Sequence, residues 1–551
     1  MAYSYEYNTG LHGKILAEKK CGFFTPLVQS IIPHAFDDGS FVIQARDETF
    51  SSMNDLDRER QIQTPGLKGP LGMVSGPLIA GIVYILLPDT LAPSARTLAT
   101  ILIWVVVYWI TEPIPLPVTA LLGSSVCVLA GVGSMREVFA PFAHPIIFLF
   151  IGSFFLAEAM IVHGLDRRFG LWLLSLRWVD GQPLRIFLIT GCAIAGLSMW
   201  ISNTAATALM VPIGLGILET IRKSETASSR HETGFLLLLA YGAGVGGVST
   251  IIGTPPNLIG VGLLSEQANL SISFTTWMAI ELPLAGVMLA MVYVLLLYFH
   301  PLPVSLPDFQ ATIQGEQDRL GPWSVGERNA CLAFGLAVFL WIMPGLLAAC
   351  LGSDHALVTW LNIHVPKELV PVLASGLLFM LPVDLRQQTF TLTWKQAIHI
   401  NWGTILLFGG GLTFGHLMVQ TTLAHTIGEG LLGMLGVQSV WGLTAMAIVA
   451  GIVLTELASN TAAASMMVPV VIAVAHTAGV SPIPPTLGAC MGASLAFVLP
   501  VSTPPNAIVY GTGLVPITSM ARAGLLLDFF GGIVIWGTLR LLCPMLGLTG
   551  A

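Results

Sequence analysis

The sequence predicts an all-α protein that crosses a membrane many times, and three observations lead to this prediction. Of the 551 residues, 54% are hydrophobic and only 10% are charged, whereas a soluble globular protein carries roughly 25% charged residues. Apolar runs near the ~20 residues that a helix needs to cross a bilayer recur along most of the chain. Glycine (58) and proline (34) are frequent, which is typical of helices that break at membrane depth.

This composition excludes several classes of protein. A chain with so few charged residues cannot cover a water-soluble body of this size, so a cytosolic enzyme, a nucleic-acid-binding protein and a secreted disulfide scaffold are excluded. The formal net charge of −7 is too mild to indicate a charged macromolecular partner. The sequence contains no P-loop motif, so it does not indicate ATP-driven transport by this chain.

The chain divides into a polar start and two apolar halves. Residues 1–71 are predicted to form a hydrophilic cytoplasmic extension, for which disorder is one expectation, because 9 of the 30 acidic residues lie there. We expect a first membrane repeat over 72–300, a polar linker over 301–329 and a second membrane repeat over 330–551. Basic residues cluster in the connections between apolar segments, and the positive-inside rule places such connections in the cytoplasm. We therefore expect a multi-pass protein of the cell (inner) membrane with a cytoplasmic N-terminus.

The most informative feature is an internal duplication of two short motifs. Ser-Asn-Thr-Ala-Ala stands at residues 202–206 and again at 459–463, an offset of 257 residues (459 − 202). Thr-Pro-Pro-Asn stands at 254–257 and again at 503–506, an offset of 249 (503 − 254). Two matched motifs in the same order and at nearly the same spacing indicate that the two halves are repeats of one unit.

Both motifs are expected to interrupt helices within the membrane. A polar Ser-Asn-Thr cluster is costly in hydrocarbon unless it binds something. The N-terminus of a half-helix offers N–H donors and a partial positive charge to an anion, while freed carbonyl and side-chain oxygens are hard ligands for a small alkali cation. The prolines of Thr-Pro-Pro prevent a continuous helix. Paired broken segments of this kind predict the binding site of a secondary transporter.

Neither motif contains a basic residue. An anion bound there would be held by neutral donors, by helix dipoles and by cations bound beside it. This arrangement predicts coupling, because the anion loses its main positive partner when the cation leaves. We therefore expect one central site for a small anion, flanked by two cation sites.

These residues resemble the motifs of the divalent anion:Na+ symporter family, which is called solute carrier family 13 in animals. The resemblance rests on the paired motifs, on Trp-Ile-Thr-Glu-Pro-Ile-Pro at residues 109–115, and on Thr455 and Glu456 just before the second Ser-Asn-Thr. It extends from about Gly72 to the C-terminus. It implies two inverted repeats with re-entrant hairpins and broken helices, a scaffold and a transport domain, a homodimer in the lipid bilayer, and an elevator movement of the transport domain.

The resemblance also implies which residues bind the dianionic substrate and Na+. The substrate would be bound at the tips of two hairpins and in the pocket between them, by Ser202, Asn203, Thr204, Ser459, Asn460, Thr461, Thr254, Pro255, Thr503 and Pro504. One Na+ site, cation site 1, would comprise Ser198, Ser202, Asn203 and Gly253. The other, cation site 2, would comprise Thr455, Ala458, Asn460 and Ser502. Ser502 departs from the family pattern. At this position the family is expected to have a small residue that offers only its backbone carbonyl, so the Ser502 hydroxyl is either a further ligand or inert.

Several acidic residues lie in or next to apolar segments, namely Glu112, Glu158, Glu281 and Glu456. Acidic residues within a membrane are functional hypotheses by default, and Glu456 adjoins cation site 2. It either tunes the cation affinity of that site or forms a structural hydrogen bond. The sequence does not decide between these two roles, and it assigns no role to the other three acids.

The sequence therefore predicts an Na+-coupled symporter, not an enzyme, for C4-dicarboxylates such as succinate, malate and fumarate. We expect about 2 to 3 Na+ ions per cycle, because two neutralise a dianion and a third makes transport electrogenic. Alternatives with the same fold are an Na+-independent dicarboxylate exchanger and an Na+-coupled transporter of sulfate or citrate. Alternatives of other classes are a channel and a membrane-embedded enzyme. Saturable counterflow would separate a transporter from a channel, and recovery of intact substrate after uptake would separate it from an enzyme.

Overall fold

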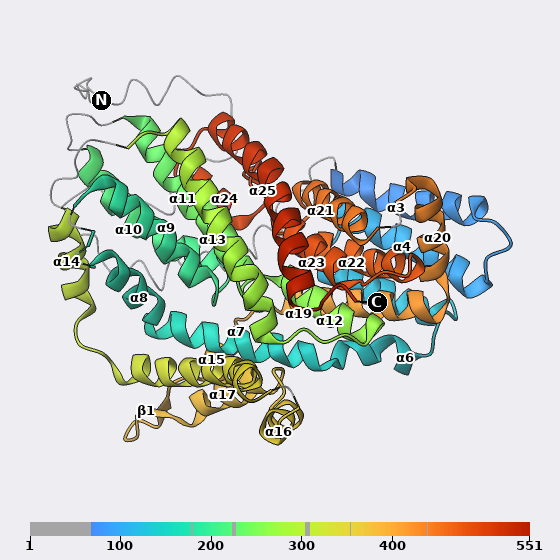
Figure 1. Ribbon diagram of the computed structural model, residues 1–551, viewed down its shortest axis with the longest axis horizontal. Helices are drawn as coiled ribbons and strands as arrows, with labels where there is room; N and C mark the ends of the chain where they lie inside the picture. The colour runs from blue at the N-terminus through green and yellow to red at the C-terminus, as the bar shows by residue number, and fades with distance from the viewer. Residues whose placement is uncertain are drawn as a thin grey trace, which may run out of the picture. The chain divides into compact units, whose positions relative to one another are not determined.

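The computed structural model describes residues 68–176, 178–179, 181–222, 228–302, 309–352, 354–437 and 439–550. The predicted extension 1–71 lies outside the described residues, apart from 68–71. Within the described ranges the chain is almost entirely α-helical (Figure 1).

The first half of the described chain consists of helices, one of them a short 3-10 helix. In order they are α3 (Lys68–Leu86), α4 (Pro93–Thr111), α5 (Leu116–Leu129), α6 (Met135–Phe139), η2 (Ala140–Ala143), α7 (Pro145–His163), α8 (Leu165–Leu174), α9 (Pro183–Ser198), α10 (Asn203–Arg222), α11 (Ser229–Val248), α12 (Pro255–Ala268) and α13 (Phe274–Phe299).

The second half adds further helices and one small antiparallel pair of strands. The helices are α14 (Phe309–Leu320), α15 (Val325–Leu351), α16 (Ala356–His364), α17 (Val370–Met380), α18 (Trp394–Ala397), α19 (Trp402–Gln420), α20 (Leu423–Leu435), α21 (Val440–Leu457), α22 (Asn460–Thr477), α23 (Ile483–Gly492), α24 (Pro504–Gly511) and α25 (Ile517–Met545). In the strands β1 (Pro382–Asp384) and β2 (Thr389–Phe390), Pro382 pairs with Phe390 and Asp384 with Thr389.

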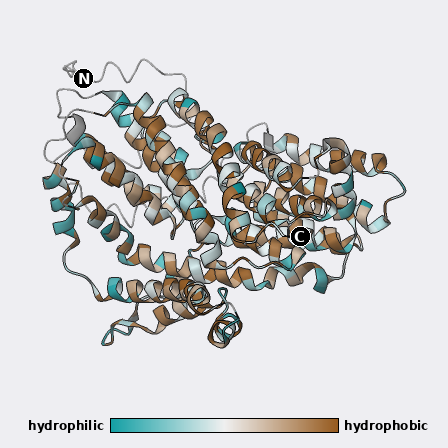
Figure 2. Cartoon of the chain, in the orientation of Figure 1, coloured by the Kyte–Doolittle hydropathy of each residue, from teal (hydrophilic) through white to brown (hydrophobic). Residues whose placement is uncertain are grey.

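Nine helical segments among the described residues are long and apolar enough to cross a membrane. They are Gly69–Leu86, Pro93–Thr111, Met135–His163, Phe274–Phe299, Val325–Leu351, Trp402–Gln420, Val440–Leu457, Asn460–Thr477 and Ile517–Met545. Figure 2 shows hydrophobic residues along most of the length of these helices and hydrophilic residues gathered on α14. The helical content and these candidate spans confirm the predicted all-α, multi-pass architecture.

Prolines and serines determine where many helices begin. α4, α5, α7, α9, α12 and α24 each have a proline in the first turn, where the missing N–H breaks no helical hydrogen bond. Ser273, Ser324 and Ser439 cap α13, α15 and α21 by accepting hydrogen bonds from backbone N–H groups. Unsatisfied N–H groups are costly inside a membrane, so these caps let helices begin without that cost.

Glycines bring the helices that carry the site close together. Gly246 of α11 lies against the backbone of Ala195 in α9, and Gly451 of α21 lies against the C-terminal end of α23. A Cβ atom at either glycine would overlap the neighbouring backbone. Small residues at helix interfaces are typical of membrane proteins, because they allow backbones to approach closely. Each half therefore contains one tightly packed pair, α9 with α11 and α21 with α23.

The long helix α25 has an exposed apolar face and a buried face. Leu525, Phe529 and Ile533 recur every four residues and are 63%, 63% and 54% exposed, as expected for a face in contact with lipid. Asp528 lies on the buried face and is 3% exposed. α25 packs against α13, α21 and α23, and Figure 1 shows α13 and α25 side by side. An acidic side chain is thus enclosed within the protein along a membrane-spanning segment.

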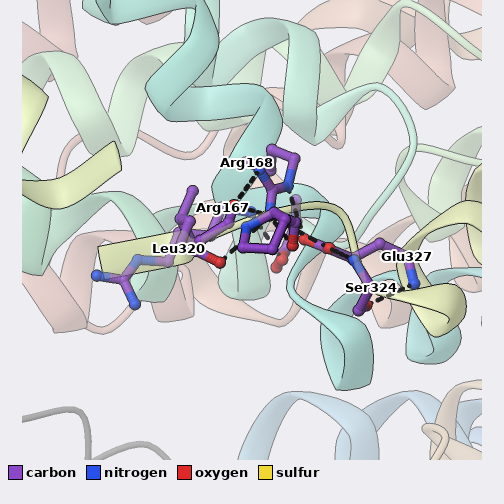
Figure 3. A network of polar contacts seen from close by, with 8 residues as sticks. Arg167, Arg168, Leu320, Ser324 and Glu327 are labelled. Carbon is purple, nitrogen blue, oxygen red and sulfur yellow. Dashed lines mark hydrogen bonds and ion pairs between the residues drawn. The ribbon is translucent and has the colours of Figure 1, made fainter. Parts of the chain in front are cut away.

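A network of ion pairs holds the connection between the two halves (Figure 3). The expected linker over 301–329 contains α14, and α15 begins within it. Arg167 of α8 lies 2.5 Å from Glu316 of α14. Arg168, the next residue of α8, lies 2.7 Å from Glu327 of α15. The network therefore fastens α8 to both α14 and α15.

Candidate functional site

Each Ser-Asn-Thr motif lies at the tip of a helical hairpin. α10 begins directly after Ser202, and α22 begins directly after Ser459. Each of these serines accepts a hydrogen bond from the backbone N–H three residues ahead, at 3.2 Å in both cases. The serine therefore caps the second helix of its hairpin. The predicted helix breaks are present at both motifs.

Three oxygen atoms gather at the first tip. Ser198 Oγ lies 2.7 Å from Asn203 Oδ1 and 2.7 Å from the backbone oxygen of Ala243 in α11. Gly247 of α11 lies against the Asn203 side chain, and Gly253 lies against the backbone of Gly247, with no room for a Cβ atom at either glycine. The structure thus brings Ser198, Asn203 and Gly253 of cation site 1 into one place. The fourth member, Ser202, caps α10.

The second tip repeats this geometry. Thr455 Oγ1 lies 2.7 Å from Asn460 Oδ1 and 2.7 Å from the backbone oxygen of Ala493. Thr455 is fully buried, as is its counterpart in the first half. Ala458 has an extended backbone between α21 and α22 (φ −134°, ψ 169°). Three of the four residues of cation site 2 therefore belong to this tip.

Both oxygen clusters contain more acceptors than protons. Each consists of a hydroxyl oxygen, an amide oxygen and a backbone oxygen, and the one hydroxyl proton satisfies only one of the two acceptors that face it. The backbone oxygen of the first cluster belongs to Ala243, within helix α11, so it also has a helical N–H partner. The oxygens of each cluster keep further lone pairs, and a small alkali cation can bind there because hard cations favour oxygen ligands. The clusters are therefore suited to a cation and not to an anion.

The Thr-Pro-Pro-Asn motifs form a second pair of helix breaks. Residues 249–254 separate α11 from α12, and residues 493–503 separate α23 from α24. Asn257 Nδ2 donates to three backbone oxygens of the preceding segment, at 3.2, 3.3 and 2.8 Å. Asn506 Nδ2 donates to two, at 3.0 Å each. Each buried asparagine therefore fixes the irregular segment that lies next to a cation site.

The sequence prediction omits these two asparagines, although both stand at the fourth position of a repeated motif. That repetition is the signal that identifies them. The prediction also omits Ala243 and Ala493, which contribute backbone oxygens to the two clusters. No side-chain pattern reveals such residues, because every residue offers a carbonyl.

The residues predicted to bind the substrate differ in exposure. Ser202 and Pro504 are exposed, whereas Thr254 is buried. Thr204 and Thr461 stand in the first turns of α10 and α22, are half-buried, and have no hydrogen-bond partner for their hydroxyls among the described residues. The remaining members of the predicted set are also half-buried, namely Asn203, Pro255, Ser459, Asn460 and Thr503. The free hydroxyls of the two threonines are available to a ligand.

The helices that carry the motifs pack crosswise between the two halves. α10, which follows the first Ser-Asn-Thr, contacts α24, which follows the second Thr-Pro-Pro. α22 contacts α12 in the corresponding way. No hydrogen bond within the described ranges joins the first tip to the second. Each tip is therefore positioned by the Thr-Pro-Pro helix of the other half.

Glu456 contacts the predicted cation site 2 through Ser502. Its Oε2 accepts a hydrogen bond from Ser502 Oγ at 2.7 Å, and its Oε1 accepts one from the backbone N–H of Val498 at 3.1 Å. The Ser502 hydroxyl is therefore bonded to an acid, and the backbone oxygen of Ser502 is the atom left for cation site 2. Glu456 thus combines structural hydrogen bonds with an acidic group next to that site.

Comparison with known proteins places the chain in a family. Residues 74–548 match the family described as the sodium:sulfate symporter transmembrane region. The chain belongs to the sodium:sulfate symporter family. Its family and its relatives are transporters, not enzymes. The resemblance inferred from the paired motifs is thereby confirmed.

Two relatives of this family member match the chain over most of their own length. The sodium-dependent dicarboxylate transporter SdcS of Staphylococcus saprophyticus is 33% identical over 487 residues, which cover 86% of this chain and 91% of the relative. SdcS of Staphylococcus aureus is 32% identical over 477 residues, which cover 84% and 89%. Among solved structures, the YdaH transporter of Alcanivorax borkumensis is 14% identical, covers 77% of this chain and 89% of its own, and has a TM-score of 0.50. At that identity the similarity concerns the fold alone.

Proposed function

We propose that this protein is an Na+-coupled symporter of C4-dicarboxylates such as succinate, malate and fumarate. The observation that carries the proposal is the pair of oxygen clusters, one formed by Ser198 and Asn203 and the other by Thr455 and Asn460, in each of which one hydroxyl proton faces an amide oxygen and a backbone oxygen. The name of the SdcS relatives, sodium-dependent dicarboxylate transporter, supports both the ion and the class of substrate.

Cations bound in the two clusters would supply the positive charge that the substrate site otherwise lacks. The N-termini of α10 and α22 would add backbone N–H donors and a partial positive charge. Thr204 and Thr461 would donate their hydroxyl protons to the substrate carboxylates. A dianion then binds well only after the cations, so substrate and Na+ cross the membrane together. Each tenfold Na+ gradient supplies ~1.4 kcal/mol per ion.

We infer that transport proceeds by an elevator mechanism in a homodimer of the cell membrane, with the two halves as inverted repeats. The equivalent contacts at the two tips support the repeat, because each half places a hydroxyl, an amide oxygen and a backbone oxygen in the same arrangement. The crosswise packing of α10 on α24 and of α22 on α12 supports movement of both sites as one body, which an elevator requires.

The family description favours sulfate as a second candidate substrate. Sulfate presents anionic oxygens to the same neutral donors, and it would depend on the same two cations. Citrate is a third anion with the required groups. An Na+-independent dicarboxylate exchanger is the alternative mechanism, in which the oxygen clusters would have a structural role only.

Radiolabelled succinate uptake into proteoliposomes tests the proposed function. We compare an inward Na+ gradient with an equal K+ gradient, with excess unlabelled sulfate or citrate as competitors. Symport predicts uptake that only Na+ drives and that sulfate does not displace. Uptake that ignores Na+ but requires internal dicarboxylate would establish the exchanger. Absence of succinate uptake together with Na+-driven sulfate uptake would establish the second candidate.

A further inference from the structure

Asp528 is a buried acid for which the proposed mechanism has no role. It lies in the membrane-spanning helix α25 and is 3% exposed. Within the described ranges, neither of its carboxylate oxygens has a hydrogen-bond partner of standard geometry. The sequence prediction omits it, although it stands within an apolar run. An acid inside a membrane protein is costly, and it usually marks a pathway for ions or protons.

Glu456 of α21 is the second acid at this place. Both of its carboxylate oxygens accept a hydrogen bond, one from the Val498 N–H and one from the Ser502 hydroxyl. These two bonds fix the carboxylate beside cation site 2. A carboxylate has about four lone-pair sites, so Glu456 keeps lone pairs free for a further ligand.

The two carboxyl groups meet at one short backbone segment. The Asp528 carboxyl lies near that of Glu456 and near the backbone of Phe497, without a hydrogen bond of standard geometry to either. Gly524, one turn before Asp528, lies against the backbone of Phe497 with no room for a Cβ atom, which allows the close approach of α25. Tyr241 Oη of α11 lies 3.2 Å from the backbone oxygen of Phe497 and interacts with both acids. Three helices therefore direct oxygen atoms toward one place.

The negative charge at this place has no positive side chain to balance it. Within the described part of the chain, neither carboxylate forms an ion pair with Lys, Arg or His. Asp528 is buried and Glu456 is half-buried. Two neighbouring carboxylates repel each other, and removal from water disfavours their charge, so a positive ligand would stabilise the ionised pair. The polar atoms that Glu456, Asp528 and Tyr241 contribute are oxygens, which are the preferred ligands of hard cations.

We propose that Glu456 and Asp528 bind a third Na+ ion, distinct from those of cation sites 1 and 2. Ser502 links the third ion to cation site 2, because its hydroxyl holds Glu456 while its backbone oxygen remains available to site 2. This role accounts for the serine at a position where the family pattern needs only a backbone carbonyl. The inference rests on the proposed symport of Na+ with a dianion.

A third Na+ changes the electrical behaviour of the transporter. Two Na+ ions and a dianion carry no net charge, whereas three carry one positive charge per cycle. Uptake then responds to the membrane potential as well as to the Na+ gradient. Removal of the charge of either acid abolishes the third site but leaves the ligands of sites 1 and 2 in place.

The test is the coupling ratio of the full-length protein in proteoliposomes, obtained from the succinate gradient that just stops net flux at fixed Na+ gradients, measured at several clamped membrane potentials. For the wild type we expect three Na+ per succinate. Asp528→Asn preserves the shape of the side chain and should give two Na+ per succinate, with uptake indifferent to the potential. Glu281→Gln is the matched control, because Glu281 is also fully buried with both oxygens unpartnered but lies on α13. It should keep a ratio of three.

Two further variants keep the test decisive if Asp528→Asn does not fold, which size-exclusion chromatography would reveal. Glu456→Gln should also give a ratio of two. Ser502→Ala should keep the ratio of three but raise the Na+ concentration for half-maximal uptake several-fold, because Glu456 loses one of the two hydrogen bonds that position it.

Three results would overturn the third site while the proposed function stands. The first is a wild-type ratio of two Na+ per succinate, and the second is a ratio of three in folded Asp528→Asn. The third is transport of the extra positive charge that depends on the pH gradient and not on the Na+ gradient. The last of these would assign the acid pair to a proton. Absence of any Na+-driven uptake by the wild type is a different result. It would overturn the proposed function and, with it, this inference.

Discussion

The two hairpin tips build the same arrangement of oxygens from different hydroxyl residues. Ser198 and Asn203 in the first half correspond to Thr455 and Asn460 in the second, at an offset of 257 (455 − 198). In both halves the hydroxyl oxygen lies 2.7 Å from the amide oxygen. The common geometry shows that a hydroxyl, an amide and a backbone carbonyl are sufficient to form the cluster.

The surroundings of the two clusters differ in charge. Where the second half has Glu456 and Ser502, the first half has Met199 and Gly253, at the offsets of the two motifs (456 − 257 and 502 − 249). In the first half the backbone oxygen of Met199 accepts a hydrogen bond from Thr250 Oγ1 at 2.5 Å, and the side chain at the position of the acid is neutral. We therefore expect cation site 2 to bind Na+ more tightly than cation site 1.

The largest expected effect comes from loss of the amide at either tip. Asn203→Ala and Asn460→Ala each remove one of three oxygens from a cluster, so both should abolish Na+-driven succinate uptake and Na+ dependence together. Asn329→Ala is the matched control, because Asn329 bonds Pro382 and Thr391 away from both tips. Normal Na+ activation in both tip variants would remove the asparagines from the cation sites.

The next effect tests the difference in charge between the halves. Two unit charges 4 Å apart attract by about 1 kcal/mol in water and about 4 kcal/mol near a protein surface. Glu456→Gln should therefore raise the Na+ concentration for half-maximal uptake roughly tenfold, since about 1.4 kcal/mol is a factor of ten. Met199→Leu, at the corresponding position, should leave it unchanged. Equal effects of the two substitutions would refute the charge difference.

A smaller effect concerns the stability of the irregular segments. Asn257 donates to three backbone oxygens and Asn506 to two, and a buried acceptor left unsatisfied costs about 1–3 kcal/mol. Both alanine variants should lower the Tm of the purified protein, and Asn257→Ala should lower it more. Thermal unfolding followed by tryptophan fluorescence measures the difference, and a larger loss for Asn506→Ala would contradict it.

The smallest effect concerns the substrate alone. Thr204→Ala and Thr461→Ala each remove one hydroxyl donor, and a hydrogen bond contributes about 0.5–1.5 kcal/mol net. The apparent succinate constant should therefore rise roughly two- to tenfold, while Na+ activation at saturating succinate stays as in the wild type. Uptake measured against succinate concentration checks this, and unchanged constants in both variants would exclude these threonines from the carboxylate site.

The sequence is sufficient to locate the helix breaks, because prolines and a repeated polar motif within apolar runs have few other physical explanations. Ser202 and Ser459 begin helices as the motif predicts. The pairing of Ser198 with Asn203 and of Thr455 with Asn460 follows a spacing of five residues across a tip, so it too is local.

Contacts between residues that are far apart in the chain cannot be predicted from such local patterns. Ala243 and Ala493 are identified only by the packing of α11 and α23 on the hairpins, because a backbone oxygen has no residue signature. Asp528 stands 72 residues after Glu456 in sequence (528 − 456), and the glycine contact of α25 brings it close. Sequence patterns report local geometry, whereas charge pairing between helices depends on tertiary packing.

Direct Na+ binding tests the central claim, that each half holds one cation in its oxygen cluster. Equilibrium binding of radioactive Na+ to the purified full-length protein, without substrate, gives the number of ions per protomer. We expect Asn203→Ala and Asn460→Ala each to lower that number by one, and the double variant to lower it by two. The same number of bound ions in the wild type and the double variant would contradict the account.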